Sequence, residues 1–381
     1  MVLTSQNKVK TMNFSITVAT AKLLFTSACN VANGTKVNID ALNYVHLSIE
    51  NGTAEVLGTD TLSIVRESAP IDIIDDFEIC IEAKKLLAVI NGYSDGEKPL
   101  HFSFNDSKAV IKHGRSKVSI TTMDSNAFPI PAIKMPSEFQ FSCGSEHLIS
   151  ALNGIFYAKA NNDARAFLNH VNFSICDSKM KLYTSDGHRL ATNNVLMNHS
   201  VDGLQGVLPH KLVELLIQTP HTGRIDFFFD ESHFFATING TVYGSKFVAA
   251  NFTDVSHIID TELTQTIRIA TTELLDSVKR IKGFMQGVRI PKLTLSFQNN
   301  ELLLNSDADK GNSIDDAITA TLVGDVVPAD ECSFSLNPSY LFDALKNIKS
   351  NDVCISFTSK SLLKITDPQN PLLSGVIMAM R

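Results

Sequence analysis

A short segment near the middle of the chain, Ser185-Asp186-Gly187-His188-Arg189, places an imidazole next to a carboxylate and a guanidinium. A histidine with a carboxylate nearby is an arrangement suited to general base catalysis. No second acid, nucleophile or set of metal ligands accompanies it, and Asp-Gly is explained as a turn sequence by backbone geometry alone. We therefore expect a turn at this position and no catalytic residue or enzyme activity.

Other chemical signatures are missing from the sequence. It contains no Gly-rich phosphate loop of the G-x-x-x-x-G-K-[ST] type, no H-E-x-x-H and no G-x-S-x-G. The six cysteines are scattered, with no C-x-x-C pair. Structural zinc sites usually take their ligands in close pairs, so we expect buried free thiols, no metal and no cofactor.

The overall composition is that of an ordinary globular protein, with 44% apolar and 19% charged residues among 381. This length predicts two to four domains. No apolar run approaches the roughly 20 residues of a membrane-spanning helix, and residues 1–11 lack the apolar region of a secretory signal. We expect a cytoplasmic protein with no membrane partner. The net charge of −7 argues against a protein that coats nucleic acid with its whole surface.

Three sets of landmarks recur along the chain with a period of about 126 residues. The first two sets are leucines in the helical parts of two strand-to-helix patterns, and the third set is a phenylalanine in the strand that follows the second pattern. The landmarks are Leu23, Leu148 and Leu274, then Leu86, Leu212 and Leu341, and then Phe104, Phe229 and Phe357. Such a long period indicates three copies of one domain.

Each copy contains two helical patterns and several strands with alternating polarity, which predicts an α+β fold with helices packed on antiparallel sheets. We expect an N-terminal extension at 1–11, with Met12 as the natural first residue, followed by domains at 12–134, 135–260 and 261–381. The proline-rich segment at 129–136 favours an extended linker between the first two domains.

Basic residues are concentrated in the six predicted helices, which carry ten Lys or Arg and six acids, while the rest of the chain carries a charge of −11. Lysines on any solvated helix face would give a similar pattern. Three similar domains suit an arc, and two arcs meeting head to tail would close a ring. Rods and compact clusters share the same repeat pattern, so the residues alone leave these arrangements open.

Seven short motifs occur in the order in which they occur in the bacterial sliding clamp, the β subunit of DNA polymerase III. They are Gly58-Thr59-Asp60, His113-Gly114-Arg115-Ser116-Lys117 with Phe128-Pro129, residues 163–169, residues 185–191, Ser245-Lys246-Phe247, Asn337-Pro338-Ser339-Tyr340 and residues 376–381. Over residues 12–381 the chain therefore resembles this family.

The resemblance implies the DNA clamp fold and a head-to-tail homodimer that forms a six-domain ring around duplex DNA. The ring would bind DNA without regard to sequence and confer processivity by tethering client proteins. The implied partners are the DNA polymerase III α subunit, the clamp loader and other proteins with a clamp-binding motif. A weakly basic lining would let DNA slide, because phosphate contacts do not read sequence.

The resemblance also implies two sets of functional residues. The positions that match the family's pocket for client peptides are Leu168, Ser185, Gly187, His188, Arg189, Leu190, Ile258, Asn337, Tyr340, Val376, Met378, Met380 and Arg381. We expect Arg189, Asn337 and Tyr340 to hydrogen-bond the peptide backbone. The positions that match the family's DNA contacts are Lys36, Lys84, Arg165, His210 and Lys211.

The sequence departs from the family pattern around the pocket. Thr253 and His257 stand where Pro and Arg are usual, Ala379 replaces a usual Pro, and no Leu follows Arg381. We expect these departures to alter which clients bind and how tightly. A three-domain adaptor that never encircles DNA is the alternative function, and a stable monomer would favour it.

Overall fold

The computed structural model describes residues 12–33, 39–72, 76–94, 98–105, 107–131, 133–199, 202–218, 222–248, 250, 254–261, 263, 265–308, 311–324, 333–357 and 362–380. Lys36, Thr253 and Arg381 lie outside these residues. The chain forms two compact units, the first made of Met1–Ser145 and Lys211–Phe247 and the second of Glu146–His210 and Val248–Arg381. No helix in the described residues is long and apolar enough to cross a membrane.

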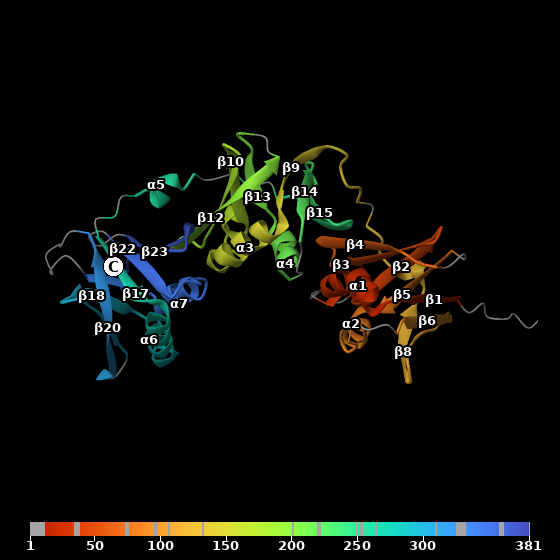
Figure 1. Cartoon of the computed structure of the whole chain (residues 1–381), viewed down its shortest axis with the longest axis horizontal. Helices are drawn as coiled ribbons and strands as arrows, with labels where there is room; N and C mark the ends of the chain where they lie inside the picture. Colours follow the sequence, from red (N-terminus) through yellow and green to blue (C-terminus); the bar gives the residue numbers. More distant parts are fainter. Residues whose placement is uncertain are drawn as a thin grey trace, which may run out of the picture. The chain divides into compact units, whose positions relative to one another are not determined.

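Eight strands and two main helices follow one another in each third of the chain (Figure 1). The first third has β1 (Met12–Ile16), α1 (Val18–Asn33), β2 (Tyr44–Glu50), β3 (Thr53–Thr59), β4 (Ser63–Pro70), β5 (Phe77–Glu82), α2 (Ala83–Asn91), β6 (Leu100–Asn105), β7 (Lys108–His113) and β8 (Ser116–Met123).

The middle third has β9 (Phe139–Gly144), α3 (Ser145–Ile155), β10 (Val171–Cys176), β11 (Lys179–Ser185), β12 (Arg189–His199), β13 (Gln205–Leu208), α4 (His210–Gln218), β14 (Arg224–Phe229), β15 (His233–Ile238) and β16 (Thr241–Lys246). A short helix, α5 (Ser256–Ile259), follows it. The last third has β17 (Gln265–Ala270), α6 (Thr271–Phe284), β18 (Leu293–Gln298), β19 (Glu301–Asp307), β20 (Ser313–Val323), β21 (Ser333–Leu336), α7 (Pro338–Leu345), β22 (Asp352–Phe357), β23 (Leu362–Asp367) and β24 (Asn370–Met378). The predicted triplication and its pair of helices per copy are confirmed.

Local sequence explains where the main helices begin. Thr17 accepts a hydrogen bond from the Thr20 amide at 3.0 Å just before α1, and Asn337 accepts one from the Ser339 amide at 2.9 Å just before α7. These side chains satisfy amides that have no partner within the helix. Pro338 occupies the first turn of α7, where its missing N–H costs nothing.

Antiparallel sheets make up the first unit. Strand β2 pairs with β3 and β5, β3 pairs with β4, and β1, β6, β7 and β8 form a second sheet. Helix α1 contacts α2, β3 and β4. Beneath α1, the rings of Phe14 and Phe25 stack on Phe102 with centroids 4.8 and 5.9 Å apart. Aromatic packing therefore forms much of this core.

A strand pair within each unit joins elements from successive thirds of the chain. In the first unit β4 pairs with β16, with Arg66 opposite Val242 and Ser63 opposite Ser245. In the second unit β12 pairs with β24, with Leu190 opposite Val376. Both junctions use the first four residues of a long strand in one third and the last strand of the next third.

The second unit has its own apolar core around α6 and α7. Ile267, Leu274, Ile281, Leu295 and Leu341 are buried there. Leu274 and Ile281 lie seven residues apart, so they occupy the same face of α6. Strand β24 completes this core with Ile377 and ends next to the turn that separates β11 from β12.

Candidate functional site

The segment Ser185–Arg189 forms a tight turn between β11 and β12. One oxygen of Asp186 accepts hydrogen bonds from the His188 and Arg189 amides, both at 3.0 Å, and Ser185 donates to the Arg189 carbonyl at 2.7 Å. Gly187 has φ of +89°, a conformation that glycine adopts without steric cost. The spacing of Asp, Gly and His is therefore explained by the turn, and the Asp186 carboxylate is held by backbone amides.

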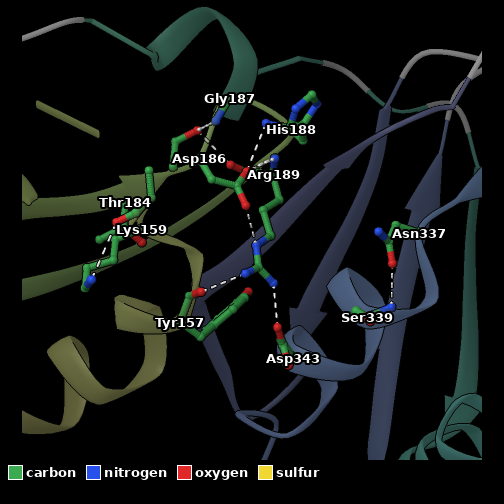
Figure 2. Close-up of polar contacts among 12 residues, drawn as sticks. Tyr157, Lys159, Thr184, Asp186, Gly187, His188, Arg189, Asn337, Ser339 and Asp343 are labelled. Carbon is green, nitrogen blue, oxygen red and sulfur yellow. Dashed lines mark hydrogen bonds and ion pairs between the residues drawn. The ribbon is translucent and has the colours of Figure 1, made fainter. Parts of the chain in front are cut away.

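Arg189 is the central residue of the site, and its side chain is only 12% exposed. It donates from Nε to Asp186 at 3.0 Å, from Nη1 to Asp343 of α7 at 2.7 Å and from Nη2 to the Tyr157 carbonyl at 2.9 Å (Figure 2). Its guanidinium carbon also lies 4.6 Å from the centroid of the Tyr340 ring. Because these contacts are all intramolecular, Arg189 joins β12 to α7, whereas the sequence suggested a ligand for the peptide backbone.

A small group of packed apolar side chains in the second unit includes Leu190, the residue that follows Arg189 in β12. Its buried members are Tyr183, Leu190, Val255, Ile259 and Val376, and the half-buried Ile258 and Leu362 pack against them. Leu190 and Val376 face each other across the β12–β24 pair. The structure thus brings together three of the predicted pocket residues, Leu190, Ile258 and Val376, on one apolar floor.

Other predicted pocket residues surround the turn. His188 is exposed, its ring is nearly parallel to that of Tyr340 at a centroid distance of 6.4 Å, and its carbonyl accepts the Met378 amide at 3.0 Å. Met378 is 52% exposed, and the Met380 amide donates to the Ser335 carbonyl at 2.7 Å. Burial raises the pKa of the Tyr340 hydroxyl, and Asp186 adds to the shift, so this hydroxyl stays a donor at neutral pH.

Two predicted pocket residues have structural roles in the described chain. Leu168 is buried at 3% exposure in the 3-10 helix Ala166–Asn169, and its carbonyl accepts the Ala160 amide. Asn337 uses its side-chain oxygen to cap α7, which leaves only its Nδ2 group for a ligand. Of the departures from the family pattern, His257 is exposed in α5 and Ala379 packs against the core of the last third.

The described residues among the predicted DNA contacts are divided between the two units, with Lys84 and Lys211 in the first and Arg165 and His210 in the second. Lys84 is exposed on α2, and Lys211 on α4 pairs with Glu214 at 3.2 Å. Arg165 binds Asp163 through two hydrogen bonds of 3.0 and 3.1 Å, which lower the pKa of Asp163 to about 2. A Cβ atom on Gly187 would lie 3.0 Å from Nη2 of Arg165, so Arg165 lies beside the Ser185–Arg189 turn.

His210, the remaining described residue of that set, packs against another histidine. The His210 amide donates to Nδ1 of His170 at 3.0 Å, and the two rings have a centroid distance of 5.0 Å. Burial, together with His210 and Lys159, lowers the pKa of His170 to about 4. His170 is therefore neutral at physiological pH.

Sequence reasoning missed Tyr157 and Asp343, which hold Arg189, and Val255 and Ile259, which complete the apolar floor. Asp343 could have been found, because it follows Tyr340 by three residues and so shares a helix face with it. Tyr157 contributes only its backbone carbonyl to Arg189. Because every residue has such a carbonyl, the sequence gives no signal for this contact.

Family models cover nearly the whole described chain. Residues 12–133 match the N-terminal domain of the DNA polymerase III beta subunit, residues 143–254 match its central domain and residues 256–381 match its C-terminal domain.

Individual proteins agree over the same length. A beta sliding clamp of Haemophilus influenzae is 24% identical over 97% of this chain and 100% of its own length, and that of Escherichia coli is 21% identical over 91% and 94%. A sliding clamp of Pseudomonas aeruginosa bound to griselimycin superposes with a TM-score of 0.83 at 20% identity, covering 97% of this chain and 99% of its own. The beta subunit of Streptococcus pyogenes gives 0.83 at 17% identity, covering 97% and 100%. These structures establish the three-domain fold.

Proposed function

Because this chain belongs to the family of DNA polymerase III beta subunits, the bacterial sliding clamps, we propose that two copies close head to tail into a ring that encircles duplex DNA. The ring tethers the replicative polymerase and other clients and so confers processivity. One observation carries the proposal: the same antiparallel strand junction occurs twice in the chain, as β4–β16 and as β12–β24.

The junction seen in β4–β16 and β12–β24 has no third example between described strands of this chain, although one strand of each type is left for it. In the described chain, residues 116–121 of β8 pair only with β7, and residues 313–319 of β20 pair only with β19. Strand β20 corresponds to β4 and β12, and β8 corresponds to β16 and β24. A third junction of the same type would therefore join β20 of one copy to β8 of the next, and two such contacts close a ring.

The two existing junctions fix the register of the third. Arg66 lies opposite Val242, and Thr192 lies opposite Ser374. Arg66 pairs with Leu57 and Thr192 with Tyr183 in their hairpins, and the equivalent pair in the last third is Asn305 and Asp315. The equivalent positions are therefore Asp315 in β20 and Lys117 in β8, so opposite charges would face each other across the dimer. Such cross-strand pairs stabilise antiparallel sheets by a few tenths of a kcal/mol to about 1 kcal/mol.

The apolar floor and the turn beside it serve as the client-binding pocket. An extended peptide would place apolar side chains against Leu190, Ile258 and Val376, and the mobile thioether of Met378 would adjust to different clients. Arg189 holds the wall of this pocket in place. The clients are the DNA polymerase III α subunit, the clamp loader and other proteins with a clamp-binding motif.

The protein acts as an accessory factor in the cytoplasm, without a catalytic site of its own. We propose that the three domains span residues 12–134, 135–260 and 261–381. For DNA we retain Lys84, His210 and Lys211 and the undescribed Lys36, and we assign Arg165 chiefly to the pocket wall because it lies next to Gly187.

Retention on DNA tests the ring. The protein, loaded onto a nicked circular duplex by a clamp loader, should remain bound at high salt and be lost once the circle is cut to a linear molecule. Equal loss from both forms would refute encirclement. A stable monomer in sedimentation equilibrium would instead favour the adaptor that never encircles DNA.

A further inference from the structure

The turn between β3 and β4 repeats the hydrogen bonds of the Ser185–Arg189 turn. One oxygen of Asp60 accepts from the amides of Leu62 at 3.0 Å and Ser63 at 2.6 Å. The Thr59 hydroxyl donates to the Ser63 carbonyl at 2.8 Å. The three equivalent distances in the Ser185–Arg189 turn are 3.0, 3.0 and 2.7 Å. The first unit therefore contains a second copy of the turn that borders the client pocket in the second unit.

Strand β16 completes this second turn as β24 completes the first. The Lys246 amide donates to the Leu62 carbonyl at 3.0 Å. The bond from the Met378 amide to the His188 carbonyl has the same length. Lys246 and Leu62 therefore occupy the positions equivalent to these two pocket residues. Leu62 is 46% exposed, and Lys246 is exposed and makes no ion pair with a described residue.

Packed apolar side chains accompany the second turn, as they accompany the first. The group consists of the buried Leu57, Ile64, Cys80 and Phe128, with the half-buried Met123 and Ile133 against them. The strand registers make Ile64 and Leu57 equivalent to Leu190 and Tyr183. Ile130 lies between two members of the group in sequence and is 54% exposed. Apolar side chains therefore remain accessible beside this turn.

Two differences give the second site its own chemistry. Ser63 occupies the position of Arg189, and its Oγ is buried and makes no hydrogen bond to any described residue. Gly244 occupies the position of Val376, and a Cβ atom there would lie 2.7 Å from the Phe235 ring, so this ring already fills the position. The second site therefore lacks the ion pairs of the first, and backbone hydrogen bonds and apolar packing hold its wall.

We propose that the β4–β16 junction is a second peptide-binding site, for an extended segment that carries an aliphatic side chain next to an acidic one. The aliphatic side chain packs against Leu62 and the half-buried members of the apolar group. The carboxylate pairs with Lys246, whose ammonium group is otherwise unpaired in the described chain. The inference rests on the proposed function, because the equivalence is with the client pocket, and it gives each chain two peptide sites of different chemistry.

Methyl signals in nuclear magnetic resonance test the site. The probe is the peptide acetyl-Ser-Leu-Glu-Leu-Ser-amide, added to the full-length protein with isotope-labelled Ile and Leu methyl groups. Leu62 and Ile133 report the second site, and Ile258 reports the client pocket. We expect saturable shifts at Leu62 and Ile133.

Variants of the two exposed residues test the chemistry of the site. Lys246→Gln should raise the Kd read at Ile133 about two- to fivefold, because an exposed ion pair is weak. Leu62→Ser should raise it about tenfold through lost apolar contact. Lys98→Gln is the control, because it makes the same charge change as Lys246→Gln at an exposed position outside the site, and it should leave the Kd unchanged.

The outcomes separate the second site from the ring. Shifts confined to Ile258, or no saturable shift at Ile133, would overturn the second site and leave the clamp intact. Equal Kd values for Lys246→Gln and Lys98→Gln would overturn the pairing with a carboxylate. Loss of the wild type from circular and linear DNA alike would refute the proposed function itself, and the methyl shifts are read without DNA.

Discussion

Nη1 of Arg189 in β12 lies 2.7 Å from Oδ2 of Asp343 in α7, which makes this ion pair a side-chain link between elements from two thirds of the chain. The same arginine holds Asp186 and the Tyr157 carbonyl. The turn, the first residue of β12 and helix α7 are therefore connected through one side chain. The shape of the proposed pocket depends on this connection.

Replacing Asp343 with Asn should destabilise the second unit, because it removes a charge partner from a guanidinium that is largely buried. We expect a loss of about 1–2 kcal/mol, seen as a fall in Tm of roughly 2–8 °C in calorimetry. Asp276→Asn, at an exposed position on α6, is the control and should leave Tm nearly unchanged. Equal Tm values for the two variants would contradict a structural role for the pair.

Gly187→Ala should weaken client binding as well as stability. It places a side chain at φ of +89° and 3.0 Å from Arg165. Gly203→Ala is a matched control, because Gly203 has φ of +83° but no neighbour within 4 Å of a Cβ atom. Both should lose about 1 kcal/mol through backbone strain. Only Gly187→Ala should also lower the affinity for a polymerase-derived peptide; equal affinities would argue against a pocket at this turn.

Truncation after Met378 should reduce polymerase stimulation and leave the dimer intact. It removes the contact between Met380 and Ser335 but keeps all of β24. Leu372→Ala changes a residue of the same strand that is 52% exposed, and it should have little effect. Full stimulation by the truncated protein would show that residues 379–381 are not part of the pocket.

Stability should depend on pH through His170. Its pKa in the folded protein is about 4, below the usual value of 6.5, because burial, His210 and Lys159 disfavour the charged form. Between these two values the unfolded chain binds the proton first, so stability is complete above pH 6.5 and declines as the pH falls towards 4. The decline should reach at most roughly 3 kcal/mol. His170→Gln should flatten the dependence of Tm on pH in this window, and parallel curves would refute the assignment.

Lys117→Glu should weaken the dimer by placing a like charge opposite Asp315 in the proposed junction. We expect the dissociation constant of the dimer to rise about five- to tenfold, equivalent to about 1 kcal/mol. Lys108→Glu makes the same charge change on β7, outside the pairing segment of β8, and serves as the control. Sedimentation equilibrium distinguishes the two, and identical dimer affinities would exclude the proposed register.

The sequence by itself determined the triplication, the two helices in each copy and the turn at Asp186-Gly187, because periodicity and turn chemistry are local properties of the chain. It also indicated Leu190, Ile258 and Val376 as neighbours through family resemblance. Only the tertiary structure decided that Arg189 is bound internally, since its partners Tyr157 and Asp343 lie 32 and 154 residues away in sequence.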